Sequence, residues 1–168
     1  DTAAPTAPTV DGLASNSLTP TISGTSGTGA ALESGESLTV SVSGATYAVV
    51  PAADGTWTLN LATAVPNTGT NLTALEDGNS YEIIATVTDL AGNVAGDAST
   101  AELSIDTTAP ALPTVDVLAA NTLLPTITGT ATLVTGETLS VTVNGATYDV
   151  VATGGTWSLN LSTAVPAS

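Results

Sequence analysis

Residues 55–61 of the chain read Gly-Thr-Trp-Thr-Leu-Asn-Leu, and the stretch returns at residues 155–161 as Gly-Thr-Trp-Ser-Leu-Asn-Leu. Apolar and polar side chains alternate through both copies, so that Trp57, Leu59 and Leu61 occupy every second position of the first. Such alternation is typical of a β-strand with one face in a core and the other in solvent. The return of the stretch about 100 residues later indicates a repeated, β-rich unit.

The repeat extends over most of the chain. Residues 1–5, 20–25 and 35–40 return in the same order at residues 106–110, 125–130 and 136–141. We therefore expect two domains: a complete repeat over residues 1–105, and a second, truncated repeat over residues 106–168. The second repeat lacks a counterpart of residues 67–105.

Alternation with a period of two predicts about seven strands in the complete repeat. They are expected over residues 8–13, 19–24, 37–43, 46–51, 56–61, 80–89 and 100–105. Ser43-Gly44 and Asn144-Gly145 lie between paired strands and suit tight hairpin turns. No segment has the apolar spacing of a helix, so the fold class we predict is all-β, an antiparallel sandwich of two sheets.

The composition excludes several kinds of chemistry. The chain has 15 acidic residues and no Lys, Arg, His or Cys, which gives a formal charge of −15. It therefore has no imidazole base, thiolate nucleophile or disulfide, and we expect no enzyme. Without cationic side chains, we expect no binding to nucleic acid or to anionic membranes. No apolar run is long enough to span a bilayer, so we expect no membrane insertion and no signal peptide within the chain.

Three motifs together resemble a known family. They are the Asp-Thr-Thr-Ala-Pro junction at residues 106–110, the Gly-Thr-Trp-x-Leu-Asn-Leu strand, and Ala-Thr-Val-Thr-Asp-Leu-Ala-Gly-Asn at residues 85–93. These motifs resemble the bacterial immunoglobulin-like repeats of giant biofilm-associated and RTX-type surface adhesins. The resemblance implies an immunoglobulin-like β-sandwich on the bacterial cell surface. It also implies extender repeats that support cell adhesion and biofilm formation and that bind calcium near domain junctions.

The acidic residues are the candidate metal ligands. No cationic side chain can pair with them, and clustered hard oxygen ligands select Ca²⁺ over softer metals. We expect a structural calcium site at the leading end of the first repeat and a second at the junction between repeats. The candidate ligands are Asp1, Glu36, Asp89, Asn93 and Asp97 at the leading end, and Asp77, Asp106 and Glu137 at the junction.

The two copies provide an internal comparison of the acids. Asp1, Asp11 and Glu36 recur as Asp106, Asp116 and Glu137, whereas Glu33 aligns with Val134. The comparison favours the recurring acids as ligands. The alternative is that these carboxylates are solvated and keep the protein soluble.

Two other functions remain open. The second repeat lacks its last strands, so the chain could be a self-assembling extracellular filament subunit that a neighbouring copy completes by strand addition. A β-sandwich could also bind carbohydrate or ice directly. Trp57 and Trp157 share a strand face with leucines, which predicts a core position rather than a sugar-binding surface. In the favoured interpretation, the partners are the neighbouring repeats of the same chain.

Overall fold

The computed structural model describes residues 1–167, and the chain divides into two compact units. The first unit is Asp1–Thr108, and the second begins at Ala109. Residues 1–167 contain strands, turns and loops. They contain no helix, and so no helix that could cross a membrane. The prediction of an all-β sandwich is confirmed, and every pair of strands but one is antiparallel in residues 1–167.

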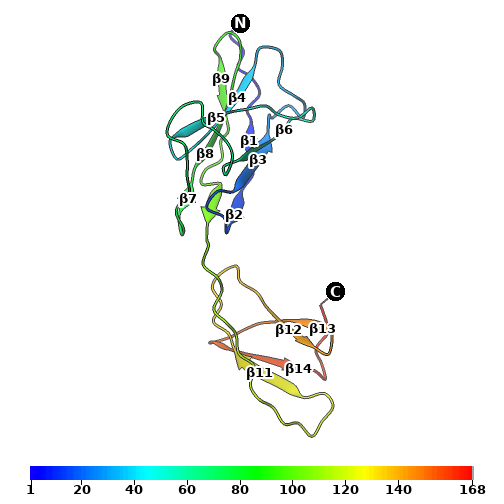
Figure 1. Cartoon of the computed structure of the whole chain (residues 1–168). Helices are drawn as coiled ribbons and strands as arrows, with labels where there is room; N and C mark the ends of the chain where they lie inside the picture. Colours follow the sequence, from blue (N-terminus) through cyan, green and yellow to red (C-terminus); the bar gives the residue numbers. More distant parts are fainter. Residues whose placement is uncertain (168) are drawn as a thin grey trace. The chain divides into compact units, whose positions relative to one another are not determined.

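The first unit contains ten strands (Figure 1). They are β1 (Thr9–Val10), β2 (Leu13–Ser15), β3 (Thr21–Thr25), β4 (Ser37–Val42), β5 (Ala45–Val49), β6 (Thr56–Asn60), β7 (Ser80–Tyr81), β8 (Ile83–Thr88), β9 (Val94–Gly96) and β10 (Leu103–Ile105). The strands form three sheets with the orders β1-β3-β6, β2-β10-β7 and β5-β4-β8-β9. Each expected strand overlaps at least one of these elements, and β9 was not expected.

The segment expected as one strand over residues 8–13 is divided between two sheets. β1 pairs antiparallel with β3, whereas β2 pairs parallel with β10. Asp11 and Gly12 lie between the two strands. The alternation of apolar residues along a strand does not depend on which other strand pairs with it. The change from one sheet to the other therefore cannot be predicted from the sequence of residues 8–13.

The core of the first unit fills the space between the sheets. β4 contributes Leu38, Val40 and Val42, each no more than 1% exposed, while β8 contributes Ile83, Ala85 and Val87. Ile84 is half exposed, which fits its place on the opposite face of β8. β4 is bonded on both edges, because it pairs with β5 on one side and with β8 on the other.

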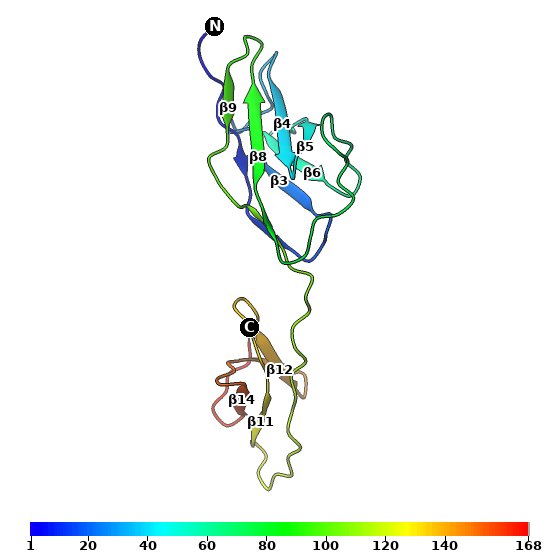
Figure 2. The ribbon, with the colours of Figure 1, turned by 90° about the vertical axis from the view of Figure 1, so that its left-hand side faces the viewer.

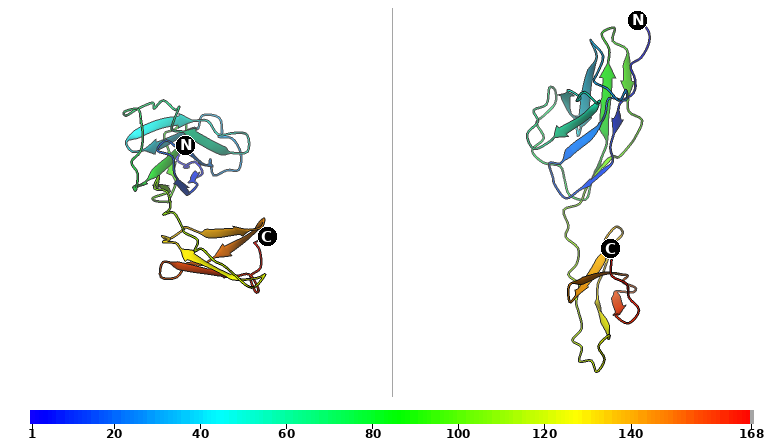
Figure 3. Two further views of the ribbon diagram at one scale, coloured as in Figure 1. Left: turned by 60° about the horizontal axis from the view of Figure 1, so that its bottom comes forward. Right: turned by 90° about the vertical axis from the view of Figure 1, so that its right-hand side faces the viewer.

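Within residues 109–167, the second unit contains four strands in two layers, coloured yellow to red in Figure 3. β11 (Thr126–Thr130) pairs with β14 (Thr156–Asn160), and β12 (Leu139–Val143) pairs with β13 (Ala146–Val150). These pairs reproduce the β3–β6 and β4–β5 pairs of the first unit. The sequence repeat is therefore a structural repeat over these four strands.

The two hairpins turn as expected from their sequences. Ser43 and Gly44 both have positive φ, at 46° and 81°, and so do Asn144 and Gly145, at 49° and 85°. Two successive positive values fit the tight turns that join antiparallel strands. The turns set the register that places Leu38 opposite Val49 in the first unit.

Candidate functional site

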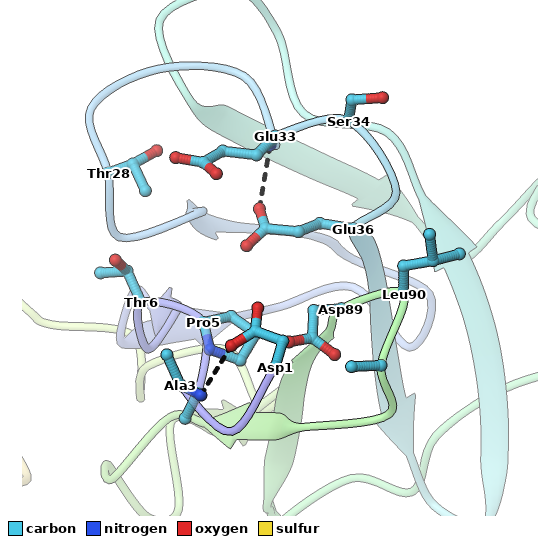
Figure 4. Close-up of a pocket in the computed structure, with 12 residues that line it drawn as sticks. Asp1, Ala3, Pro5, Thr6, Thr28, Glu33, Ser34, Glu36, Asp89 and Leu90 are labelled. Atoms are coloured by element: carbon cyan, nitrogen blue, oxygen red, sulfur yellow. Dashed lines mark hydrogen bonds between the residues drawn. The ribbon is translucent and has the colours of Figure 1, made fainter.

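An open cleft of about 530 Å³ lies at the end of the first unit that holds Asp1, which we call the leading end (Figure 4). Three segments form it: the N-terminal residues, the loop before β4 and the turn after β8. Four carboxylates line it, those of Asp1, Glu33, Glu36 and Asp89. Asp1, Glu36 and Asp89 are candidate ligands from the sequence, and the structure brings them to one cleft.

Asp89 is held by the turn between β8 and β9. Its two carboxylate oxygens accept hydrogen bonds of 2.8 Å from the backbone N–H and from the side-chain amide of Asn93. These bonds, the side-chain bond foremost, hold the pKa of Asp89 below its ordinary value. The same amide also donates to the backbone oxygen of Asp1 at 3.4 Å. Asn93 thus connects the turn to the N-terminal segment.

Glu36 closes its own loop. Its carboxylate accepts a bond of 2.9 Å from the backbone N–H of Glu33, and its own N–H donates to the Glu33 carbonyl at 3.1 Å. Glu137 makes the same pair of bonds with Val134, at 2.8 and 3.1 Å. The recurrence of this acid in both copies is therefore explained by the loop it closes.

The other recurring acids also have local partners. Asp1 accepts from the N–H of Ala3, and its counterpart Asp106 accepts from the N–H of Thr108, both at 2.9 Å. Asp11 accepts a bond of 2.7 Å from the Ser23 hydroxyl, and Asp116 accepts a bond of the same length from Thr128. The two acids of each pair therefore make the same kind of bond, to the backbone or to the neighbouring strand, at equivalent positions of the two copies of the repeat.

Asp97 does not line the cleft. Its carboxylate accepts a bond of 2.8 Å from the backbone N–H of Ala85 and one of 3.0 Å from the Ser99 hydroxyl. Its own N–H donates to the Ala85 carbonyl. The expectation that Asp97 joins the other ligands at the leading end is corrected, because this residue continues the pairing of β9 along β8.

A second group of acids lies where the chain leaves the first unit, which we call the trailing end. Asp77 accepts a bond of 2.6 Å from the N–H of Thr107, and this bond is the main reason that the pKa of Asp77 is low. The N–H of Asp106 donates to the Ser15 carbonyl at 2.9 Å. Glu76 accepts from the side-chain amide of Asn79. Glu137 belongs to the second unit.

The cleft offers oxygen ligands without a preformed metal cage. Within residues 1–167, no three acidic side chains lie close enough together to hold a metal ion. Asp1 and Glu33 are nevertheless exposed, Glu36 and Asp89 are half-buried, and none of the four is paired with a cationic side chain, since the sequence has none. Such a set suits a hard cation such as Ca²⁺, which accepts flexible geometry and water ligands. Calcium binding stays a prediction.

Glu33 is the cleft residue that the comparison of the two copies discounted. Its exposed carboxylate lines the cleft, whereas the backbone N–H of the same residue is taken by Glu36. A comparison limited to recurring acids could not find it, because the second copy has Val134 there. Its position in the loop before β4, three residues from Glu36, was the available signal.

Both tryptophans are core residues, as the strand pattern predicts. Trp57 and Trp157 are 2% and 3% exposed. Their indole N–H groups donate to the backbone oxygens of Thr25 and Thr114. Neither ring forms a surface on which a sugar could stack.

No family model and no curated protein matches the chain. The chain is similar to a solved structure of a 1.5-MDa bacterial ice-binding adhesin, at 24% sequence identity and a TM-score of 0.39. The likeness covers 90% of this chain and 52% of the other, so the chain spans about half the length of that structure. The resemblance to bacterial immunoglobulin-like repeats stays a prediction.

Proposed function

We propose that the chain consists of extender repeats of a secreted bacterial surface adhesin, which separate a binding domain from the cell. The observation that carries the proposal is the path of the chain through the first unit, which begins at one end of the sandwich and leaves at the other (Figure 2). Repeats with this path add their lengths when they follow one another. The function needs no catalysis, and the chain has neither His, Cys nor Lys.

Contacts at the two ends support this path. At the leading end, the side-chain amide of Asn93 in the β8–β9 turn donates a hydrogen bond to the backbone oxygen of Asp1. At the trailing end, the N–H of Thr107 donates to Asp77, which precedes β7 in the sequence. The extended chain from residue 80 to residue 89 runs between these ends. At roughly 3.3 Å per residue, it separates them by about 30 Å.

We further propose that calcium limits bending between consecutive repeats. In the first unit the leading end carries the four cleft carboxylates and the trailing end carries Glu76, Asp77 and Asp106, and the second unit has Glu137 at the position of Glu36. Two unit charges 4 Å apart repel by about 1 kcal/mol in water, so acidic ends that follow one another disfavour close packing. A divalent cation that binds carboxylates from both removes the repulsion and connects the repeats.

Small-angle scattering of the whole chain tests the proposal. We expect a larger maximum dimension, with a narrower distribution of shapes, in millimolar calcium than in chelator at matched ionic strength. Magnesium should have a weaker effect, because it gives up its water ligands reluctantly. Scattering that is the same in calcium and in chelator would contradict the role of calcium. A maximum dimension as small as that of a compact globular protein of 168 residues would contradict the extender role.

A further inference from the structure

The end of β14 is a feature that the function above leaves unused. β14 ends at Asn160, and residues 160–162 read Asn-Leu-Ser, which is the Asn-x-Ser/Thr sequence required for N-linked glycosylation. Asn71-Leu72-Thr73, in the loop between β6 and β7, is the second such sequence. These triplets arise easily by chance in a chain rich in Ser and Thr, so the motif alone does not identify an acceptor.

A turn holds the side-chain amide of Asn160 in one orientation. Its oxygen Oδ1 accepts two hydrogen bonds from Ser162, one of 3.0 Å from the backbone N–H and one of 2.7 Å from the hydroxyl. A backbone N–H can only donate, so the atom that it meets is the amide oxygen and not the nitrogen Nδ2. Within residues 1–167, Nδ2 has no hydrogen-bond partner, and the Asn160 side chain is exposed. Nδ2 is therefore accessible to a reagent from solution.

The bond from the Ser162 hydroxyl also affects the chemistry of the amide. An amide nitrogen is a poor nucleophile, because its lone pair is delocalised into the carbonyl group. Loss of a proton from Nδ2 places negative charge on Oδ1, and the two donors of Ser162 stabilise that charge. The turn therefore favours the deprotonated, nucleophilic form of the Asn160 amide.

The first unit contains the same turn without the hydroxyl. Residues 60–62 read Asn-Leu-Ala, and the Ala62 N–H donates to Asn60 Oδ1 at 2.9 Å. The backbone oxygens of Asn60 and Asn160 both accept from the N–H groups three and four residues further along, at 3.2 and 2.9 Å. Asn60 is exposed in a unit that has all ten strands. The position is therefore open to solvent in a complete repeat as well.

Asn71 lacks this arrangement, although its side chain is exposed. Within residues 1–167, no hydrogen bond joins Thr73 to the side chain of Asn71. Bringing the Thr73 hydroxyl to the amide would therefore require an ordering of the loop that costs conformational entropy. Asn160 is the better acceptor in the folded chain.

We propose that Asn160 is an acceptor of an N-linked sugar. The co-substrate is a sugar whose anomeric carbon is bonded to a phosphate oxygen, and a glycosyltransferase that recognises Asn-x-Ser/Thr catalyses the transfer. Nδ2 gives a proton to a base of the transferase and forms a bond to the anomeric carbon. The bond from this carbon to oxygen breaks, and the phosphate leaves with its electron pair. The proposal is independent of the extender role and of calcium.

The test treats the whole folded chain with two kinds of sugar donor. A soluble N-glycosyltransferase with a nucleotide-linked hexose would add one hexose, whereas a membrane oligosaccharyltransferase with a lipid-linked oligosaccharide would add the oligosaccharide. Masses of chymotryptic peptides locate the sugar, because the chain has no Lys or Arg at which trypsin could cut. Short peptides of the two triplets provide the intrinsic rates. Relative to them, we expect Asn160 in the whole chain to react at least about fivefold faster than Asn71, which is the contribution of one hydrogen bond.

The two copies of the turn provide matched variants. Ser162→Ala reproduces the Asn-Leu-Ala sequence of the first unit and should abolish the modification of Asn160, whereas Ser162→Thr should retain it. Ala62→Ser adds the hydroxyl to the turn of the complete first unit and should make Asn60 an acceptor. This variant tests the turn independently of the stability of the second unit.

Three results would each overturn the proposal. They are the absence of sugar from Asn160 with both donors, modification of Asn71 as fast as Asn160 relative to their peptides, and the absence of sugar from Asn60 in Ala62→Ser. Attachment to Asn160 from one donor alone supports the proposal and identifies the source of the sugar.

Discussion

The carboxylate of Asp77 accepts a hydrogen bond from the backbone N–H of Thr107 at 2.6 Å. This bond joins the turn before β7 to the segment that leaves the first unit. The trailing end is therefore held by an acid that was expected to bind calcium. The same acid can serve both purposes, because a carboxylate has two oxygens with several lone pairs.

Replacement of Asp77 by Ala should release this segment. We expect faster hydrogen exchange at Thr107 and no change at the amides of β4, because the carboxylate is exposed and lies outside the core. Asp77→Asn should have an intermediate effect, because the amide oxygen still accepts but carries no charge. Exchange at Thr107 that is as slow in Asp77→Ala as in the natural chain would contradict this role.

Acid should weaken the same bond. The pKa of Asp77 in the folded state is lowered, chiefly by the bond from Thr107, below the ordinary value of about 3.9. A group with a lowered folded pKa stabilises the fold above its unfolded pKa and loses that contribution as the pH falls through its folded pKa. Exchange at Thr107, corrected for its intrinsic pH dependence, should therefore accelerate below about pH 4. Asp77→Asn should abolish this acid-induced step.

Calcium should stabilise the first unit through the leading cleft. We expect the unfolding temperature of the chain to rise in millimolar calcium, and Glu33→Gln to reduce this rise, because Glu33 contributes an exposed carboxylate to the cleft. Asp149→Asn on β13 is the matched control, since it removes one negative charge outside the cleft. Calorimetry at constant ionic strength separates binding from screening. An equal rise for the two variants would indicate screening alone.

Gly24→Ala should destabilise the first unit by at least about 2 kcal/mol. A Cβ at this position would collide with the carbonyl oxygen of Thr9 and with the Trp57 ring. Gly96→Ala is the control, because the nearest atom to its new Cβ is the Ala85 oxygen at 3.7 Å. It should change the free energy of unfolding by less than about 0.5 kcal/mol. Chemical denaturation monitored on each variant checks both values.

The two units should respond differently to the same core change. Val40→Ala removes methyl groups from a fully buried site and should cost roughly 2–3 kcal/mol in the free energy of unfolding of the first unit. Val141→Ala affects a half-buried site and should cost about 1 kcal/mol in the second unit. Hydrogen exchange resolves the stability of each unit. Equal costs would show that β12 is covered in solution.

The sequence predicts the strands better than it predicts their partners. Alternation correctly identifies the buried faces at Leu38 and Trp57, because burial of every second residue is a local property of a strand. The passage of the chain from β1 to β2 depends on β10, about 90 residues further along, and so leaves no local signal. β9 was missed for a related reason: its three residues pair with β8 but bury little.

The candidate site shows a similar division. Loop positions brought Asp1, Glu36 and Asp89 to one end, which the order of strands in a sandwich makes foreseeable. Recurrence between copies was a poorer guide to the residues that line the cleft. It selected Glu36, which closes its loop as Glu137 does in the second unit, and discounted Glu33, although both Glu33 and Glu36 line the cleft. A residue can recur because it maintains the fold, and sequence alone does not separate that reason from binding.

The parallel pairing of β2 with β10 has a mechanical consequence. β2 lies near the start of the first unit and β10 near its end, and three register pairs join them, from Leu13 with Leu103 to Ser15 with Ile105. Tension on the two ends of the unit pulls these strands in opposite directions along their own axes. Their hydrogen bonds are then loaded in shear and share the force, instead of opening one after another. A unit joined in this way should resist being pulled apart along its length.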